Sequence, residues 1–533
     1  MADTAEAILK EAARFSQAVL APLNVVMDQQ GCALQGGRVK VAPGHAEAWR
    51  AFCDAGWQTL DKSAEHGGQG LSLIVWAAVQ ELFDRGSVAF GMLPSSQGAA
   101  SKLLEAHADE AIKAEWLPKL GSGEWAATIC ISEVEAGSDV GRIRTLATPL
   151  DDGEWSITGE KAWITFGDHD LAPRIGHCLL ARTPGAPPGA AGLSLFLAPS
   201  VLDDGSRNAI AVRRLEEKLG LHGSPTCALG FEGARAQLVG VQGRGLSQLF
   251  AMITQMRLSV GVQGVGIASG AAETARAYAA ERRQGGPPAQ PPVSLDSHAD
   301  VQRQLMQSLS RVEVLRGLVY AAAVQADLAA LETDPAAAAL ASALTGWFLP
   351  IVKTFGGEAA FDTASEAIQV LGGAGYVRDW PLEQALRDAR IFTIYEGASG
   401  MQALDLLHRR LWRDEGRGLN AFLDMARAEV AQSTGSQAAE CARVLDLLQD
   451  AAQRLDGWKG QAREAGAGAT AFLNLAGLAA TGWIAVRLAG LSDRRLAAAG
   501  RWWLSDLRAR AGLEHARATA GAGRLADFAA FRP

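Results

Sequence analysis

The 533-residue sequence lacks the cysteine and histidine spacings of a disulfide-rich protein or of a metal site. Its six cysteines include no Cys-x-x-Cys pair, and its nine histidines show no ligand spacing. Scattered cysteines of this kind are typical of reduced thiols in a cytoplasm. The pattern predicts neither a disulfide framework nor a metal centre, and it favours a cytoplasmic location.

The sequence also lacks an excess of positive charge. The formal net charge is −8, and no stripe of lysine and arginine alternates with aromatic residues, so a nucleic-acid partner has no electrostatic support. The N-terminal stretch M-A-D-T-A-E-A-I-L-K carries acidic residues where a secretory signal would carry basic ones, and no apolar core follows it. We therefore expect neither a nucleic-acid partner nor secretion.

One uncharged run covers residues 469–486, and its 18 residues are enough for a nominal transmembrane candidate. Its content of Ala, Gly, Thr and Asn makes it only mildly hydrophobic. We expect a helix that is buried by packing against other helices, and no integral membrane segment. Contact with a membrane surface is the alternative interpretation.

The sequence does contain enough apolar residues for several cores, at 48% hydrophobic and 20% charged. Short β-rich runs such as A-A-T-I-C-I-S and L-S-L-F-L-A lie between blocks with helical spacing of apolar residues. We predict a mainly α protein with a central, small antiparallel β domain, a four-helix bundle and a C-terminal helical extension. The predicted domains are residues 1–125, 126–240, 241–412 and 413–533.

A single glutamate interrupts a largely apolar stretch, R-I-F-T-I-Y-E-G-A-S-G-M-Q-A-L, at residues 390–404. Apolar surroundings destabilise a carboxylate, so Glu396 should be protonated, paired or used as a base. A helix is predicted over residues 395–411, which leaves a second interpretation open. In that interpretation, Glu396 is an acid near a helix N-terminus, stabilised by the helix dipole.

Several longer motifs carry a resemblance to a known family. They are W-Q-T-L-D-K-S-A-E-H-G-G-Q-G-L (57–71), E-W-A-A-T-I-C-I-S-E-V-E-A-G-S-D-V-G (124–141), I-T-G-E-K-A-W-I-T-F-G-D-H-D (157–170), A-I-Q-V-L-G-G-A-G-Y-V-R-D (367–379) and R-D-A-R-I-F-T-I-Y-E-G (387–397). With these motifs the chain resembles the acyl-CoA dehydrogenases, in the branch that has an added C-terminal domain. The resemblance implies FAD-dependent α,β-dehydrogenation of an acyl-CoA, an electron-transferring flavoprotein as partner, and a homodimer.

The resemblance assigns roles around the bound thioester. Glu396 corresponds to the base that removes the α-proton, and its backbone N–H is expected at the thioester oxygen together with a flavin ribityl hydroxyl. Tyr395 and Gly397 would line the substrate. Arg257, in Q-M-R-L-S-V-G, corresponds to an arginine near the catalytic glutamate.

Other motifs correspond to positions that hold the flavin. Ser132 matches a hydroxyl beside the flavin ring, and Ser138 matches one near the pyrophosphate and the CoA. Trp163 and Thr165 match residues that cover the ring and hydrogen-bond near its N5 atom. Without the resemblance, these residues would be interpreted as a Gly-Ser turn and a core tryptophan.

Arg282 lies 25 residues after Arg257, so an unbroken helix would separate them by roughly 37 Å. One flavin dinucleotide is too short for both, and the resemblance implies that Arg282 binds the FAD of a neighbouring subunit. Gln369, Gly372 and Gly373 are further candidates for the adenosine end. The alternative is that both arginines are solvated. The glycines of residues 264–270 are interpreted as helix-packing positions.

The chain departs from the family pattern at three positions. Ala398 stands where a threonine usually contacts FAD, and Ser399 is a possible substitute. Val134 replaces a common proline, and Arg142 replaces a small residue. Two other functions stay open on this scaffold, namely an acyl-CoA oxidase and a non-catalytic flavin-binding relative.

Overall fold

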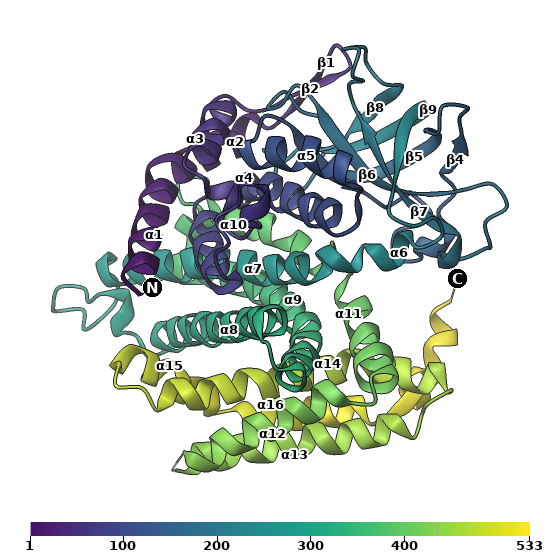
Figure 1. Cartoon of the computed structure of the whole chain (residues 1–533). Helices are drawn as coiled ribbons and strands as arrows, with labels where there is room; N and C mark the ends of the chain where they lie inside the picture. Colours follow the sequence, from purple (N-terminus) through teal and green to yellow (C-terminus); the bar gives the residue numbers. More distant parts are fainter. Residues whose placement is uncertain (1, 434, 533) are drawn as a thin grey trace. The chain divides into compact units, whose positions relative to one another are not determined.

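The computed structural model describes residues 2–433 and 435–532. The chain forms two compact units that divide between Met256 and Arg257. Figure 1 labels many of its helices and strands and colours them along the sequence. All six cysteines are free thiols, as their spacing predicts. The finer division into four domains stays a prediction.

The N-terminal part of the first unit is helical. Aromatic rings from three of its helices fill its core. The ring centroid of Phe52 lies 5.4 Å from the ring centroids of both Phe83 and Phe90. A short hairpin separates the second helix from the third. The elements are α1 (Ala2–Phe15), α2 (Ala21–Gln30), β1 (Ala33–Gln35), β2 (Arg38–Lys40), α3 (His45–Asp54), α4 (Leu73–His107) and α5 (Glu110–Ser122).

The β-rich block forms a sheet whose pairing closes on itself. The order β4–β5–β9–β7–β6 returns from β6 to β4, while β3 pairs with β6 and β8 pairs with β9. Most pairs are antiparallel, but β3–β6 and the short β4–β6 contact are parallel. The strands are β3 (Ala126–Cys130), β4 (Leu146–Pro149), β5 (Trp155–Thr165), β6 (Ile175–Arg182), β7 (Leu193–Pro199), β8 (Ile210–Leu215) and β9 (Thr226–Val239).

The sequence pattern did not indicate β4 or β8. Strand β4 ends in Pro149 and has one buried residue, and β8 includes Arg213 and Arg214 and has no buried residue. Both owe their structure to the long strands they pair with. A hydrophobic pattern cannot reveal a strand whose side chains stay partly in water.

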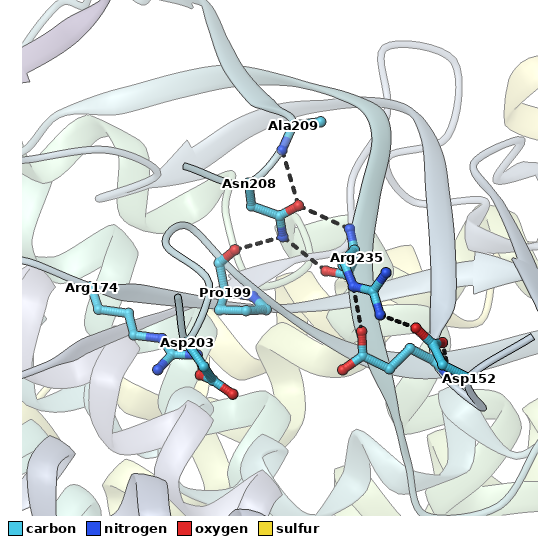
Figure 2. Close-up of polar contacts among 8 residues, drawn as sticks. Asp152, Arg174, Pro199, Asp203, Asn208, Ala209 and Arg235 are labelled. Carbon is cyan, nitrogen blue, oxygen red and sulfur yellow. Dashed lines mark hydrogen bonds and ion pairs between the residues drawn. The ribbon is translucent and has the colours of Figure 1, made fainter. Parts of the chain in front are cut away.

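A buried asparagine links the loop after β7 to β9 (Figure 2). The Nδ2 atom of Asn208 donates to the carbonyls of Pro199 at 2.7 Å and Arg235 at 2.8 Å. Its Oδ1 accepts from the backbone N–H groups of Ala209 and Arg235, both at 2.9 Å. The Arg235 side chain in turn binds Glu154 at 2.7 Å, which ties the start of β5 to the same point.

We expect Asn208→Ala to lower the free energy of unfolding by about 2–4 kcal/mol, because backbone groups of Pro199 and Arg235 lose their partner in a buried place. Chemical denaturation measures this loss. The matched control is Asp203→Ala, since that carboxylate pairs with Arg174 at 2.7 Å but is 85% exposed. Exposed pairs contribute about 0–1 kcal/mol. Equal losses in the two variants would contradict the role of Asn208.

The second unit is built from long helices. Helix α8 packs along α9, and α14 packs against α13, α15 and α16. Helix α7 begins at Phe250 in the first unit and continues unbroken to Glu281. The helices are α7 (Phe250–Glu281), α8 (Ala299–Leu331), α9 (Pro335–Leu371), α10 (Leu382–Ala389), α11 (Ser399–Asp405), α12 (Arg417–Gln432), α13 (Ser436–Asp456), α14 (Ala462–Ala489), α15 (Arg494–Leu504) and α16 (Leu507–Ala518), with a π-helical segment at Leu406–Arg413.

Glycines bring α7 and α9 into backbone contact. A Cβ on Gly264 would lie 2.1 Å from the carbonyl oxygen of Gly356, and one on Gly261 would lie 2.3 Å from Val352. Neither position has room for a side chain. The interpretation of residues 264–270 as helix-packing positions is therefore confirmed, at Gly264.

The C-terminal helices extend the core of the second unit. Phe348 of α9 stacks on Trp483 of α14 with ring centroids 6.0 Å apart. By length and composition, three helices among the described residues could cross a membrane: Ala299–Leu331, Pro335–Tyr376 and Ala462–Ala489. The apolar window of Ala462–Ala489 is 89% buried in the structure. Its apolar residues are thus used in packing.

Candidate active site

Glu396 lies in a short connection between two helical segments. The 3₁₀ turn Arg390–Thr393 precedes it, and α11 begins only at Ser399. The predicted start of a helix at residue 395 is therefore wrong. Glu396 has φ 54° and Gly397 has φ 90°, and left-handed backbone cannot continue a right-handed helix.

The connection is fixed by contacts within the second unit. Buried Gln402 of α11 donates from Nε2 to the carbonyl oxygens of Glu396 at 2.9 Å and Gly397 at 3.2 Å. The Tyr395 hydroxyl hydrogen-bonds Gln263 of α7. A left-handed glutamate is strained, and such strain persists where surrounding contacts hold it. These contacts hold the backbone on both sides of Glu396.

The charge state of Glu396 is set by opposing effects. Burial raises the pKa of its carboxyl, and the cations Lys353 and then Arg257 lower it. Measured over the whole residue, Glu396 is exposed to solvent, so the burial that raises its pKa acts on the carboxyl group and not on the residue as a whole. Its backbone N–H forms no hydrogen bond with the described residues. A carboxyl with raised pKa beside a free N–H suits proton abstraction next to a carbonyl.

Arg257 is not a solvated arginine. Its side chain is 12% exposed, and Nη1 lies 2.5 Å from Oδ2 of Asp405. Arg409 also approaches Asp405, at 3.1 Å. The pair holds the Arg257 guanidinium where it lowers the pKa of Glu396.

Ala398, where the family usually has a threonine, lies at the start of α11. Ala398 is the N-cap residue and supplies no side-chain hydrogen bond. The next residue, Ser399, donates from Oγ to Oε1 of Glu358 at 3.3 Å. The hydroxyl proton of Ser399 is therefore used within the protein in this conformation.

In the first unit, a buried ion pair holds the Ser132 loop to β5. Nζ of Lys161 lies 3.0 Å from Oε1 of Glu133 and 3.1 Å from the carbonyl of Ile131. The carbonyl of Ser132 accepts from the N–H of Ala162 at 2.9 Å. Glu133 also accepts from the Thr145 hydroxyl at 2.6 Å. Ser132 is thereby placed next to the strand that carries Trp163.

Trp163 is not a core residue, because it is 51% exposed. The pairing of β5 with β9 shifts register between Lys161 and Ile164, and Trp163 has φ 60° in this bulge. A bulge redirects a side chain that regular alternation would place elsewhere. Thr165 ends the same strand and is half-buried. An exposed indole on a rigid strand is suited to cover a flat ring.

Ser138 and the departures Val134 and Arg142 lie in the loop after β3. All three are exposed, Val134 at 77%. Arg142 forms an ion pair with Asp139 at 2.8 Å. The added charge of Arg142 is thus partly balanced by its own loop.

The predicted adenosine-site residues do come together, in a pocket of about 780 Å³ in the second unit. A Cβ on Gly372 or Gly373 would meet no atom within 4 Å, so both backbones face open space. The pocket is lined by Tyr278, Arg282, Gln284, Gly285, Leu295, His298 and residues 369–374. Its lining therefore includes all of the predicted residues Arg282, Gln369, Gly372 and Gly373.

Helix α7 joins this pocket to the Glu396 region. The helix is continuous between Arg257 and Glu281, so the span of roughly 37 Å expected for 25 residues applies. Arg282 directly follows the end of α7, so Arg257 and Arg282 lie far apart within the second unit.

The sequence did not point to several residues that shape the site. Lys353, Gln402 and Asp405 are buried on helices, and Lys161 with Glu133 forms an internal pair. Polar residues within apolar helical runs were the available signal. Their roles depend on neighbours distant in the sequence.

The helical N-terminal part, the closed β-sheet and the helical bundle with Glu396 between its segments together define the acyl-CoA dehydrogenase fold. Models of the acyl-CoA dehydrogenase N-terminal, middle and C-terminal domains match residues 2–124, 128–234 and 243–411. The chain is 40% identical over 498 residues to 3-methylmercaptopropionyl-CoA dehydrogenase of Ruegeria pomeroyi, covering 90% of this chain and 84% of that protein. The chain belongs to the acyl-CoA dehydrogenase family.

Two further comparisons cover the C-terminal helices as well. A broad-specificity linear acyl-CoA dehydrogenase, FadE5 of Mycobacterium tuberculosis, is 32% identical over 92% of this chain and 85% of its own. The crystal structure of an acyl-CoA dehydrogenase complexed with FAD from Bacillus anthracis superposes with a TM-score of 0.80 at 19% identity, over 97% of this chain and 88% of that one. The helices after residue 411 thus belong to a shared extended architecture.

Proposed function

We propose that the protein catalyses FAD-dependent α,β-dehydrogenation of an acyl-CoA to the trans-2-enoyl-CoA. Glu396 carries the proposal, because its carboxyl has a raised pKa and its backbone N–H has no partner among the described residues, which suits a base beside a thioester. The carboxylate takes the α-proton and becomes the neutral acid. Its N–H donates to the thioester oxygen, where negative charge develops.

The residues present fit FAD. Arg282 can bind a pyrophosphate with its guanidinium, and the open backbones of Gly372 and Gly373 can approach an adenosine. The exposed indole of Trp163, with Ser132 and Thr165 on neighbouring backbone, suits the flavin ring. When bound, FAD supplies the acceptor for the hydride that leaves Cβ.

The separation of Arg257 from Arg282 supports a homodimer in which Arg282 serves the partner's FAD. Sedimentation analysis tests this, with twice the chain mass as the expected result. We further propose that an electron-transferring flavoprotein reoxidises the enzyme. Stimulation of turnover by a purified electron-transferring flavoprotein is the corresponding assay.

The deciding experiment is an anaerobic titration of the flavin-loaded protein with acyl-CoA thioesters. The panel contains linear acyl-CoAs and 3-methylmercaptopropionyl-CoA, the substrates named for two relatives. We expect the flavin absorbance to bleach with at least one thioester. Peroxide release in air would instead favour an oxidase, and flavin that no thioester bleaches would favour a non-catalytic relative.

A further inference from the structure

A fully buried lysine lies on α9 in the second unit. Lys353 is 0% exposed, and its Nζ forms no hydrogen bond with any of the described residues. Lysine is almost never fully buried without a partner, because removing an ammonium from water is costly. A buried ammonium is expected to have a negatively charged group nearby, and the two charges then stabilise each other.

The geometry of α9 directs Lys353 toward the segment that carries Glu396. Residues four apart lie on one face of a helix, and Gly357 follows Lys353 by four. A Cβ on Gly357 would lie 3.0 Å from the backbone carbonyl carbon and oxygen of Phe392, so this face of α9 packs on the residues just before Glu396. Glu358 extends the contact through its bond from Ser399.

The other charged side chains around Glu396 have contacts of their own. Arg257 of α7 pairs with Asp405 of α11 at 2.5 Å, and Arg409 and Arg410 of the π-helical segment also face Asp405. On α9 itself, the Glu358 carboxylate receives the Ser399 hydroxyl and also raises the pKa of Lys353, though less than Glu396 does. Of the described cations that act on Glu396, Arg257 has its own carboxylate and Lys353 has none within ion-pair distance.

We propose that Lys353 is a positioning residue for the base: its buried, unpartnered ammonium, on the face of α9 that packs on the residues just before Glu396, favours the ionised form of the Glu396 carboxyl. This inference rests on the proposed function of Glu396. The effects of Glu396 and Lys353 on each other's pKa support it. After the effect of burial, Lys353 is the charge that most lowers the pKa of Glu396. Burial lowers the pKa of Lys353 to about 8, against the effect of Glu396, so the lysine is cationic in the pH range where a glutamate titrates.

The test is Lys353→Met in the flavin-loaded protein, which keeps the side-chain length and removes the charge. We expect kcat/KM to fall about tenfold at about pH 6, and to approach the wild-type value at about pH 9, where Glu396 is ionised in both proteins. An activity-independent measurement is the infrared carbonyl band of protonated Glu396, assigned by its loss in Glu396→Gln. This band should persist to higher pH in Lys353→Met than in the wild type.

Thr354→Val is the matched control, since Thr354 is the adjacent residue, 1% exposed, and the change is nearly isosteric. It should leave the pH profile unchanged, and Lys353→Arg should restore the wild-type profile by restoring the charge. Lys353→Gln serves as a second neutral variant if Lys353→Met does not fold. An unshifted band, or an equal loss at every pH, would overturn the role of Lys353. If Glu396→Gln turned over at the wild-type rate, the proposed function itself would fail instead.

Discussion

Glu396→Gln is expected to retain its flavin and to be reduced by acyl-CoA about 10²–10⁴-fold more slowly than the wild type, the range typical of a general base. The amide has nearly the same shape but cannot accept the α-proton. Anaerobic stopped-flow absorbance at the flavin band measures the rate directly. Because burial raises the pKa of Glu396, the wild-type kcat/KM should fall with decreasing pH at a higher pH than an ordinary glutamate would give.

The control for this result is Glu358→Gln. Burial also raises the pKa of Glu358, and its carboxylate accepts from Ser399 rather than facing a reacting group. We expect a change of only a few-fold in the flavin reduction rate, because one partly exposed neutral-donor hydrogen bond is worth about 1 kcal/mol. Full-rate reduction of Glu396→Gln would remove the base assignment, whatever the control shows.

Arg282→Gln is expected to weaken FAD binding about 10- to 100-fold, as loss of a charge-assisted contact to a pyrophosphate would. Arg282 lines the pocket that contains Gln369, Gly372 and Gly373. Titration of the flavin-depleted protein with FAD, followed by flavin fluorescence, gives the dissociation constant. The guanidinium is exposed, so its replacement should leave the fold intact.

The neighbouring arginine provides the control for this variant. Arg283 is also exposed, and its backbone bridges to Ser294 outside the pocket lining. Arg283→Gln should bind FAD as the wild type does. If both substitutions weakened binding equally, a general effect of positive charge would explain the loss better than a specific contact.

Much of the helical architecture could be predicted, because local signals and tertiary packing agree there. The spacing of apolar residues predicts long helices at residues 298–331 and 335–371. They correspond to α8 (Ala299–Leu331) and α9 (Pro335–Leu371). Asp334 caps α9 by accepting from the N–H groups of Ala336 and Ala337, and Pro335 occupies the first turn. Where an N-cap residue, a proline in the first turn and an apolar face occur together, the sequence predicts the start of the helix to within a residue or two.

The site was less predictable, and each error has a local cause. The helix expected from residue 395 begins at Ser399 because Gln402, Gln263 and the face of α9 hold a left-handed turn that no propensity favours. Alternation within β5 would not place Trp163 on the surface, and a register shift against β9 does so. In both cases, contacts from another part of the chain override the local preference.

By itself, the sequence determined which side chains are available and in what order: a glutamate in an apolar stretch, two arginines 25 residues apart, and glycines that leave room for backbone contacts. Only the tertiary structure decided that Lys353 is fully buried and acts on Glu396, that Asp405 pairs with Arg257, and that residues 369–374 line a pocket with Arg282. The reason is that burial and electrostatic potential are sums over neighbours in space, and most of those neighbours are far away along the chain.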